Sequence, residues 1–172
     1  GSDMEAVVLR PAGVYGPRDT DVLLLFRIAA RGWLPAPPGG GPLQPVYARD
    51  VALAVGRACR AEAGFGPHPV AERRSYGWSE VRTLLEEAVG RRVRRVPVPG
   101  PLLELAGAAA GVVGRLAGRA PEFDRRRARD LSRHTWTCDP GPTEEALGWR
   151  AETPLAEGMR ETVAWYRREG WL

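Results

Sequence analysis

Lysine is absent from this chain of 172 residues, and all 25 of its basic residues are arginine. Schiff-base enzymes, phosphate-binding P-loops and Tyr-x-x-x-Lys catalytic pairs each require a lysine, so the sequence excludes all three. A base preference of the genome accounts for the arginine bias, and selection for phosphate binding is the alternative. The net charge of +4 therefore does not by itself identify a partner.

Cysteine and histidine are scarce, with two residues of each. Cys59 and Cys138 stand far apart and outside any CxxC pair, which predicts reduced thiols in a cytoplasmic chain. His68 and His134 belong to no HExxH spacing, so we expect no metal site and interpret both as surface or polar-network residues. The sequence also has no Gly-x-Ser-x-Gly elbow, and we assign no catalytic residue.

The sequence has no cationic segment followed by an apolar one, so we expect no signal peptide. Hydrophobic residues make up 44% and charged residues 27% of the chain, as in an ordinary soluble protein. We interpret residues 1–4 as a tag or linker remnant and residues 5–172 as a single domain.

The opening stretch contains the strongest local signal. Ala6 to Leu9 is a short apolar run, which predicts a strand covered on both faces, as inside a parallel sheet. Pro11 is expected to stop its ladder, and Gly13 and Gly16 allow a sharp turn before an apolar helix. Open α/β sheets bind their ligands where a strand passes through such a loop into a helix.

The rest of the chain predicts a mixed α/β fold with few short strands and a largely helical C-terminal half. Four of the expected helices start with a short polar residue as N-cap. These residues are Asp21, Asp50, Ser79 and Thr153. Strands are expected at 44–48, near residue 70 and at 93–98, with a Pro/Gly loop over 35–42.

Helical periodicity indicates which faces are buried. In the helix expected over 51–61, Cys59 shares an apolar stripe with Ala52, Val55 and Ala58, which predicts a core cysteine. In the last helix the stripe consists of Leu155, Met159, Thr162, Val163 and Tyr166. Trp165 and Trp171 are interpreted as packing residues.

Two later segments leave alternatives open. The apolar run from Leu102 to Ala117 is too short and too rich in Gly and Ala to predict a membrane span. It fits a buried or dimer-forming helix, a lid over an apolar substrate, or a helix lying on a membrane surface. The charged helix expected over 122–133 is interpreted as a solvated face, and we expect no nucleic-acid partner.

Several motifs, in order, resemble the extended short-chain dehydrogenases/reductases, the NAD-dependent epimerase/dehydratase family. Residues 10–17, Arg-Pro-Ala-Gly-Val-Tyr-Gly-Pro, are similar to the loop after that family's sixth strand. Residues 47–50, Tyr-Ala-Arg-Asp, resemble its His-Val-Asp-Asp motif, with the last Asp kept and the first His replaced. Residues 147–149, 153–158 and 162–166 are also similar, so the resemblance spans nearly all of residues 5–172.

The resemblance implies a Rossmann-type parent that binds NAD or NADP. The family's Gly-x-x-Gly-x-x-Gly loop and Tyr/Lys pair are not in this sequence, so we expect the chain alone to bind no cofactor. The implied site residues fall into two groups. The cofactor-facing residues are Pro11, Val14 and Tyr15, and the substrate-facing residues are Ala12, Gly13, Phe26 and Tyr47.

The resemblance implies the C-terminal, substrate-binding part of an NAD(P)-dependent oxidoreductase, epimerase or dehydratase, either a piece of a longer protein or a natural truncation. Its small-molecule substrate would react at a hydroxyl or ketone of a sugar nucleotide or an apolar ring compound. Leu43 stands near the place of an arginine that pairs with diphosphate in sugar-nucleotide members, which favours an apolar substrate. The alternative is a free-standing, non-enzymatic module for ligand binding or oligomerisation. Self-association is expected in either case, because a missing N-terminal half leaves a strand edge unpaired.

Overall fold

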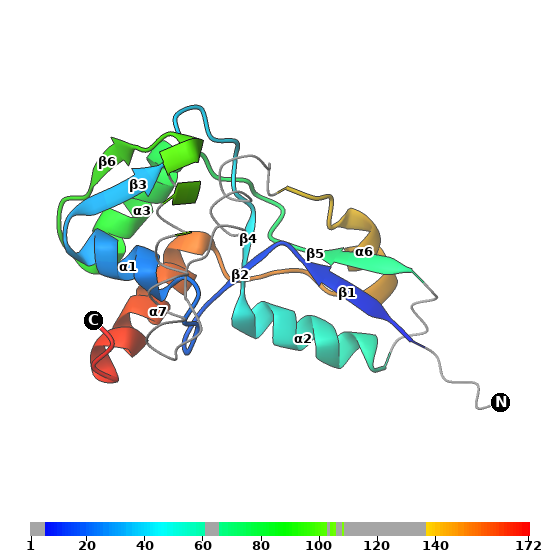
Figure 1. Cartoon of the computed structure of the whole chain (residues 1–172). Helices are drawn as coiled ribbons and strands as arrows, with labels where there is room; N and C mark the ends of the chain where they lie inside the picture. The colour runs from blue at the N-terminus through cyan, green and yellow to red at the C-terminus, as the bar shows by residue number, and fades with distance from the viewer. Residues whose placement is uncertain (1–5, 61–65, 103, 106–107, 109–136) are drawn as a thin grey trace.

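The computed structural model describes residues 6–60, 66–102, 104–105, 108 and 137–172. The short strands lie at three places across the molecule, and helices lie beside them (Figure 1). The strands are β1 (Val8–Pro11), β2 (Gly13–Tyr15), β3 (Trp33–Ala36), β4 (Pro45–Tyr47), β5 (Pro67–Val70) and β6 (Arg94–Pro97). The helices are α1 (Leu23–Ala30), α2 (Ala48–Ala58), α3 (Trp78–Val89), α6 (Gly141–Leu147) and α7 (Leu155–Arg168).

The strands form three parallel pairs, β1 with β5, β2 with β4, and β3 with β6. Parallel pairing requires a crossover between the partners, and here helices lie within those crossovers. The expected α/β class, with few short strands and a helical end, is confirmed.

An opening strand is confirmed, but it spans Val8–Pro11 instead of Ala6 to Leu9. Its ladder with β5 ends at the pair of Pro11 and Val70, as expected for a residue without an N–H. Pro11 still pairs because the Ala12 N–H donates to the Val70 carbonyl at 3.0 Å. The expected coverage of both faces of this strand was wrong, since Val8 is 49% exposed.

Strands β2 and β3 were not expected. Gly32, with φ +92°, ends α1 as expected, and β3 follows at once and includes Pro35 and Ala36 of the expected loop. Leu34 and Ala36 are both 0% exposed, so burial of alternate side chains drives this strand. Proline is tolerated there because, among the described strands, β3 has a partner only on one side.

The four expected N-caps were wrong. At α1 the carboxylate of Asp19, not Asp21, accepts backbone N–H bonds from Asp21 at 2.7 Å and Val22 at 3.4 Å. Asp50 and Ser79 lie inside the first turns of α2 and α3. The N-cap residues that precede the helices make no side-chain cap bonds.

The apolar stripe of α7 is confirmed, and it forms the main core with α1 and α3. Phe26 and Tyr166 meet edge to face at 5.6 Å between ring centroids. Trp171 stacks on Tyr166, and Trp165 meets Trp171 at 4.9 Å, which confirms the packing role of both tryptophans. All five stripe residues of α7 are buried.

The interpretation of Cys59 as a core residue was wrong. Cys59 is exposed at the end of α2, and Val55 is 48% exposed. Ala54, which is 0% exposed, turns to the protein instead and packs in a second, smaller cluster with Val46 and Trp149. The buried face of α2 is therefore rotated relative to the predicted apolar stripe. The elements that contact α2, including β4 and α6, determine which of its faces is buried.

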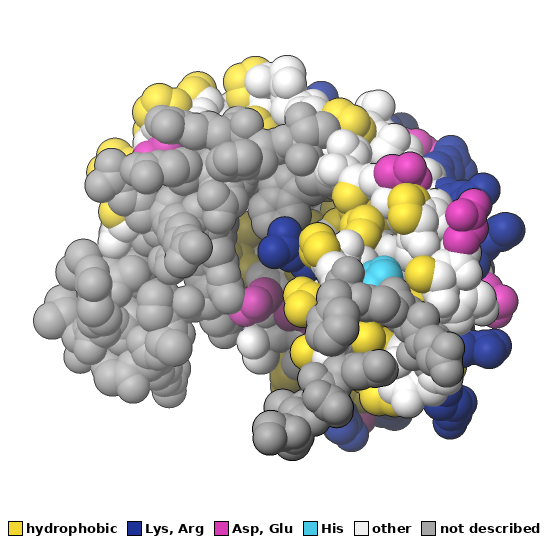
Figure 2. Space-filling view, turned by 90° about the vertical axis from the view of Figure 1, so that its right-hand side faces the viewer, with side chains coloured by type: hydrophobic (Ala, Val, Ile, Leu, Met, Phe, Trp, Pro, Cys, Tyr) yellow, Lys and Arg dark blue, Asp and Glu magenta, His cyan; other side chains and the backbone are white. Residues whose placement is uncertain are grey.

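The expected helix over 122–133, His134, Trp136 and most of the run from Leu102 to Ala117 lie outside the described residues. Within the described part of the chain, no helix is both long and apolar enough to cross a membrane. Figure 2 shows the face with β1, β5 and α6, where arginine and acidic side chains are interspersed with hydrophobic ones.

Candidate functional site

The loop that the family resemblance singles out joins two strand pairs. Its residues lie at the end of β1 and along β2, and β2 lies against β4 with Val14 opposite Val46 and Tyr15 opposite Tyr47. Successive side chains of β2 point to opposite sides, so Val14 is 37% exposed whereas Tyr15 is buried. Pro11 and Val14 are exposed, whereas Ala12 and Gly13 between them are half-buried.

Tyr15 packs between β4 and α7. Its ring lies 5.5 Å from that of Tyr47, and among the described residues its buried hydroxyl has no hydrogen-bond partner. A methyl group added at Gly158 would lie 2.8 Å from Tyr15 Cζ and closer still to the hydroxyl. Helix α7 therefore approaches β2 this closely because residue 158 has no side chain.

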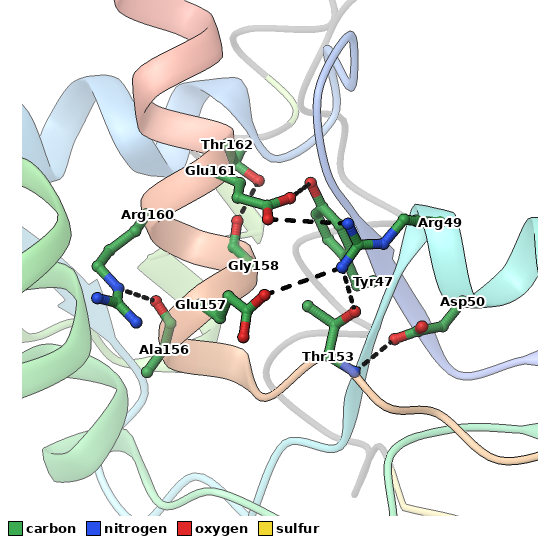
Figure 3. Close-up of polar contacts among 10 residues, drawn as sticks. All are labelled: Tyr47, Arg49, Asp50, Thr153, Ala156, Glu157, Gly158, Arg160, Glu161 and Thr162. Atoms are coloured by element: carbon green, nitrogen blue, oxygen red, sulfur yellow. Dashed lines mark hydrogen bonds and ion pairs between the residues drawn. The ribbon is translucent and has the colours of Figure 1, made fainter.

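A polar network joins the β4–α2 junction to α7 (Figure 3). The Tyr47 hydroxyl donates to Glu161 Oε2 at 2.7 Å. Arg49 lies 3.8 Å from Glu161 and 3.9 Å from Glu157, and donates to Thr153 Oγ1 at 3.2 Å. Both ion pairs are about half exposed, so they position α7 more than they stabilise it.

Asp50 contributes the most buried bond of the network. It is 1% exposed, and its Oδ2 accepts the Thr153 N–H at 3.0 Å (Figure 3). The segment of residues 47–50 therefore supplies three side chains that hold the start of α7. Asp50 does so across the fold, which explains why it does not cap its own helix.

A second polar cluster surrounds Gln44 and Tyr76. Buried Gln44 donates to the Glu72 carbonyl at 2.6 Å and accepts the Cys138 N–H at 2.7 Å. Tyr76 donates to the Glu72 carboxylate at 2.5 Å. Beside this cluster lies a cavity of about 670 Å³. Its lining residues are Gln44, Arg73, Thr137, Cys138, Asp139, Pro140 and Gly141.

The tyrosines near these clusters are weak acids. Burial raises the pKa of Tyr15, Tyr47 and Tyr76, and the carboxylates of Glu161 and Glu72 raise the pKa of Tyr47 and Tyr76 further. The three phenols therefore stay protonated at neutral pH and do not serve as general bases there. Burial also raises the pKa of Glu72.

The structure brings most of the expected site residues together. Six of them follow one another along β1, β2 and β4, namely Pro11, Ala12, Gly13, Val14, Tyr15 and Tyr47. Phe26 instead lies 2% exposed in the core against Tyr166. Within the described residues, no group of three His, Cys, Asp or Glu side chains could hold a metal ion.

Sequence reasoning missed the residues that hold α7. Glu157 and Glu161 are four apart, so they share one face of the helix, and Gly158 lies between them. The spacing of the two glutamates could have indicated an acidic face on α7. Nothing in the neighbouring sequence indicates that Arg49 and Tyr47 lie against that face. Gln44 carried no signal at all.

A comparison with family models finds no match. A search of curated proteins finds the ceramide reductase of Caulobacter vibrioides, 31% identical over 173 residues that include 99% of this chain. The chain spans about half the length of that relative, 54%.

Solved structures match the fold. One is a UDP-glucose 4-epimerase from Thermotoga maritima with UDP-glucose, with a TM-score of 0.66 and 23% identity over 95% of this chain and 46% of that one. Another is the Bordetella bronchiseptica enzyme WbmG in complex with NAD and UDP, with a TM-score of 0.66 and 20% identity over 99% of this chain and 46% of that one. The chain thus has the fold of about half of a Rossmann-like epimerase/dehydratase protein.

Proposed function

We propose that this chain is the C-terminal, substrate-binding part of an extended short-chain dehydrogenase/reductase, and that the whole enzyme is a reductase of a ceramide-like lipid. The observation that carries the proposal is the 31% identity to a ceramide reductase, which extends over 99% of this chain. The sugar-nucleotide neighbours are less similar in sequence, at 23% and 20% identity.

The geometry of the opening loop is compatible with a cofactor held by another part of the enzyme. Pro11 and Val14 are exposed, and β1 has an unpaired edge opposite β5 among the described strands. A parallel strand from a dinucleotide-binding half would extend the sheet at that edge. When bound in the reduced form, NADH or NADPH would supply the hydride, and the exposed residues Pro11 and Val14 would face the nicotinamide.

The chain's own residues would position and enclose the substrate rather than transfer its proton. Ala12 and Gly13 offer backbone without bulky side chains, and the tyrosines behind them stay protonated. The Arg49–Asp50 network holds α7 against this layer. Leu43, which stands where sugar-nucleotide members are expected to carry an arginine, pairs with Tyr76 and offers no charge to a diphosphate.

A chimaera tests the substrate class. The half of the Caulobacter ceramide reductase that matches this chain is replaced by the chain. Nicotinamide absorbance then follows reduction of the keto form of ceramide by NADH or NADPH, or oxidation of the ceramide hydroxyl in the reverse direction. We expect activity with the ceramide pair and none with UDP-glucose. Grafting the equivalent half of the Thermotoga epimerase is the matched control and should abolish activity on the ceramide pair. A chimaera that binds the nucleotide but does not act on the ceramide pair would contradict the proposal.

The non-enzymatic module is the second candidate, and one observation favours it. A cavity of about 670 Å³ lies beside Gln44 and Arg73. A module would bind a ligand there without a dinucleotide-binding half. Titrating the isolated chain with ceramide in micelles and with UDP-glucose, and comparing Arg73→Gln, distinguishes the candidates, because only the module predicts a strong loss with that variant.

A further inference from the structure

The outer face of the β3–β6 pair is unusually apolar for a solvent-facing surface. Trp33 pairs with Arg94, and Pro35 pairs with Val96. Paired residues and residues two apart project to the same face, so these four side chains share one face. Leu34 and Ala36 on the opposite face are 0% exposed, whereas Trp33 is 48% and Val96 36% exposed.

The apolar surface continues along the chain beyond β6. The Val98 N–H donates to the Ala36 carbonyl at 3.0 Å, so the ladder reaches Val98, and residues 100–102 and 104–105 are helical. Leu102 is 56% and Leu105 66% exposed. Leu102 follows Val98 by four residues, which keeps it within roughly 13 Å of the ladder's end.

Four of the eight exposed large hydrophobic side chains in the described residues therefore belong to this one segment of the fold. Single exposed hydrophobic residues are ordinary, whereas a gathered set marks an interaction surface. We call this set, with the arginines beside it, the β6 surface. Its members are Trp33, Arg91, Arg92, Arg94, Val96, Leu102 and Leu105.

The charge of the β6 surface has one sign. Residues 91–103 contain four arginines and no acidic residue, and the four arginine side chains are exposed. Arg91 donates to the Ala30 carbonyl, and Arg95, which pairs with Leu34 and so projects to the opposite side, donates to the Pro37 carbonyl. The structure gives the side chain of Arg94 no hydrogen bond or ion pair among the described residues, while its backbone N–H donates to the Gly32 carbonyl. Glu104, the next acidic residue, is 8% exposed.

We propose that the β6 surface docks on a membrane that contains anionic phospholipid. Exposed arginines complement lipid phosphates, and a tryptophan with neighbouring leucines suits the boundary between headgroups and acyl chains. A second copy of the chain fits this surface poorly, because an isologous contact would place arginines against arginines. The inference is carried by this surface alone and does not rest on the proposed reductase function.

Vesicle sedimentation with the whole chain tests the proposal. We expect the protein to sediment with vesicles of phosphatidylcholine and phosphatidylglycerol, and much less with phosphatidylcholine alone. Binding should weaken as salt is raised. The double variant Arg92→Gln/Arg94→Gln should lose about tenfold or more in affinity, because each arginine near an anionic surface contributes about fivefold.

The apolar contribution needs a matched control. Trp33→Ser with Leu102→Ser should reduce vesicle binding at least tenfold, whereas Leu53→Ser with Val55→Ser should not. The control residues on α2 are comparably exposed, at 53% and 48%, but lie outside the β6 surface. Circular dichroism verifies that all variants are folded.

Four results would overturn the proposal. The first is a wild-type chain that does not sediment with anionic vesicles. The second is equal loss of binding in the α2 control and the β6-surface variant. The third is light scattering that shows a dimer which Trp33→Ser with Leu102→Ser dissociates, since the surface would then bind a second copy. Retention on DNA that depends on the arginines and not on Trp33 would likewise point to a nucleic acid.

Discussion

At the scale of single residues, Gly158 decides how closely α7 packs on β2. Gly158→Ala should destabilise the protein by about 1–3 kcal/mol, because the new methyl group overlaps the buried ring of Tyr15. This cost exceeds the roughly 1 kcal/mol that alanine gains over glycine inside a helix. Urea denaturation midpoints measure the change.

Gly56 in α2 is the matched control for that substitution. A methyl group there meets nothing within 4 Å, so Gly56→Ala should stabilise the protein by about 0.5–1 kcal/mol. Equal stability of the two variants would show that α7 does not lie against Tyr15 as described.

The hydroxyls of Tyr15 and Tyr47 predict opposite outcomes for the same substitution. Tyr15→Phe should leave the free energy of unfolding unchanged or slightly raised, because the buried hydroxyl has no partner among the described residues. Tyr47→Phe should lower it by about 1–2 kcal/mol, because it removes the bond to Glu161. Thermal unfolding of both variants checks the pair, and a larger loss in Tyr15→Phe would refute this ordering.

At the scale of elements, the start of α7 depends on the residues that open α2. Asp50→Ala should cost about 1–3 kcal/mol, since it leaves the buried N–H of Thr153 without its acceptor. Asp50→Asn keeps an acceptor oxygen and should cost less. Hydrogen exchange at the Thr153 amide is the local measurement, and unchanged protection in Asp50→Ala would contradict the assignment.

The two Pro/Gly-rich segments show how elements depend on their surroundings. Residues 10–17 contain the end of β1 and all of β2, so this segment pairs first with β5 and then with β4. In residues 37–42, Gly40 lies so close to Trp78 that an added methyl group would be 2.6 Å from Trp78 Nε1. The space over Gly40 is therefore filled by the ring of Trp78, so this loop packs on the start of α3.

At the scale of the whole molecule, all four tyrosines of the chain, Tyr15, Tyr47, Tyr76 and Tyr166, have raised pKa values, mainly because they are buried. In the unfolded chain they titrate near pH 10. Above that pH the unfolded state binds fewer protons than the folded state, so stability falls as pH rises.

The expected result is alkaline unfolding in which the phenols ionise together. Tyrosinate absorbance and far-UV circular dichroism should change over the same pH range, above pH 10. Four phenols that ionise near pH 10 while the circular dichroism stays native would contradict this prediction. Tyr166→Phe should move the transition to higher pH, provided the variant is otherwise as stable.

Local sequence patterns predicted those helices and strands in which the apolar residues of the sequence repeat are also the buried ones. The five stripe residues of α7 repeat at helical spacing, and β1 and β4 lie in short stretches that contain apolar or β-branched residues. Strand β6 lies in a stretch where valines and arginines are interspersed. Glycine at the ends of α1 and α3 also has a local cause, since both adopt positive φ. These features need no knowledge of distant residues.

Only the tertiary structure decided which polar groups meet. Asp50 bonds a residue that lies 103 positions away, and Tyr47 bonds one 114 positions away, so neither partner is readable from neighbouring residues. The same holds for exposure of Cys59, which depends on what covers α2, and for β3, which needs β6 beside it. Periodicity determines which face of a helix or strand is apolar, but packing against distant elements determines which face is buried. That packing formed the polar network around α7 and left Trp33 on the surface.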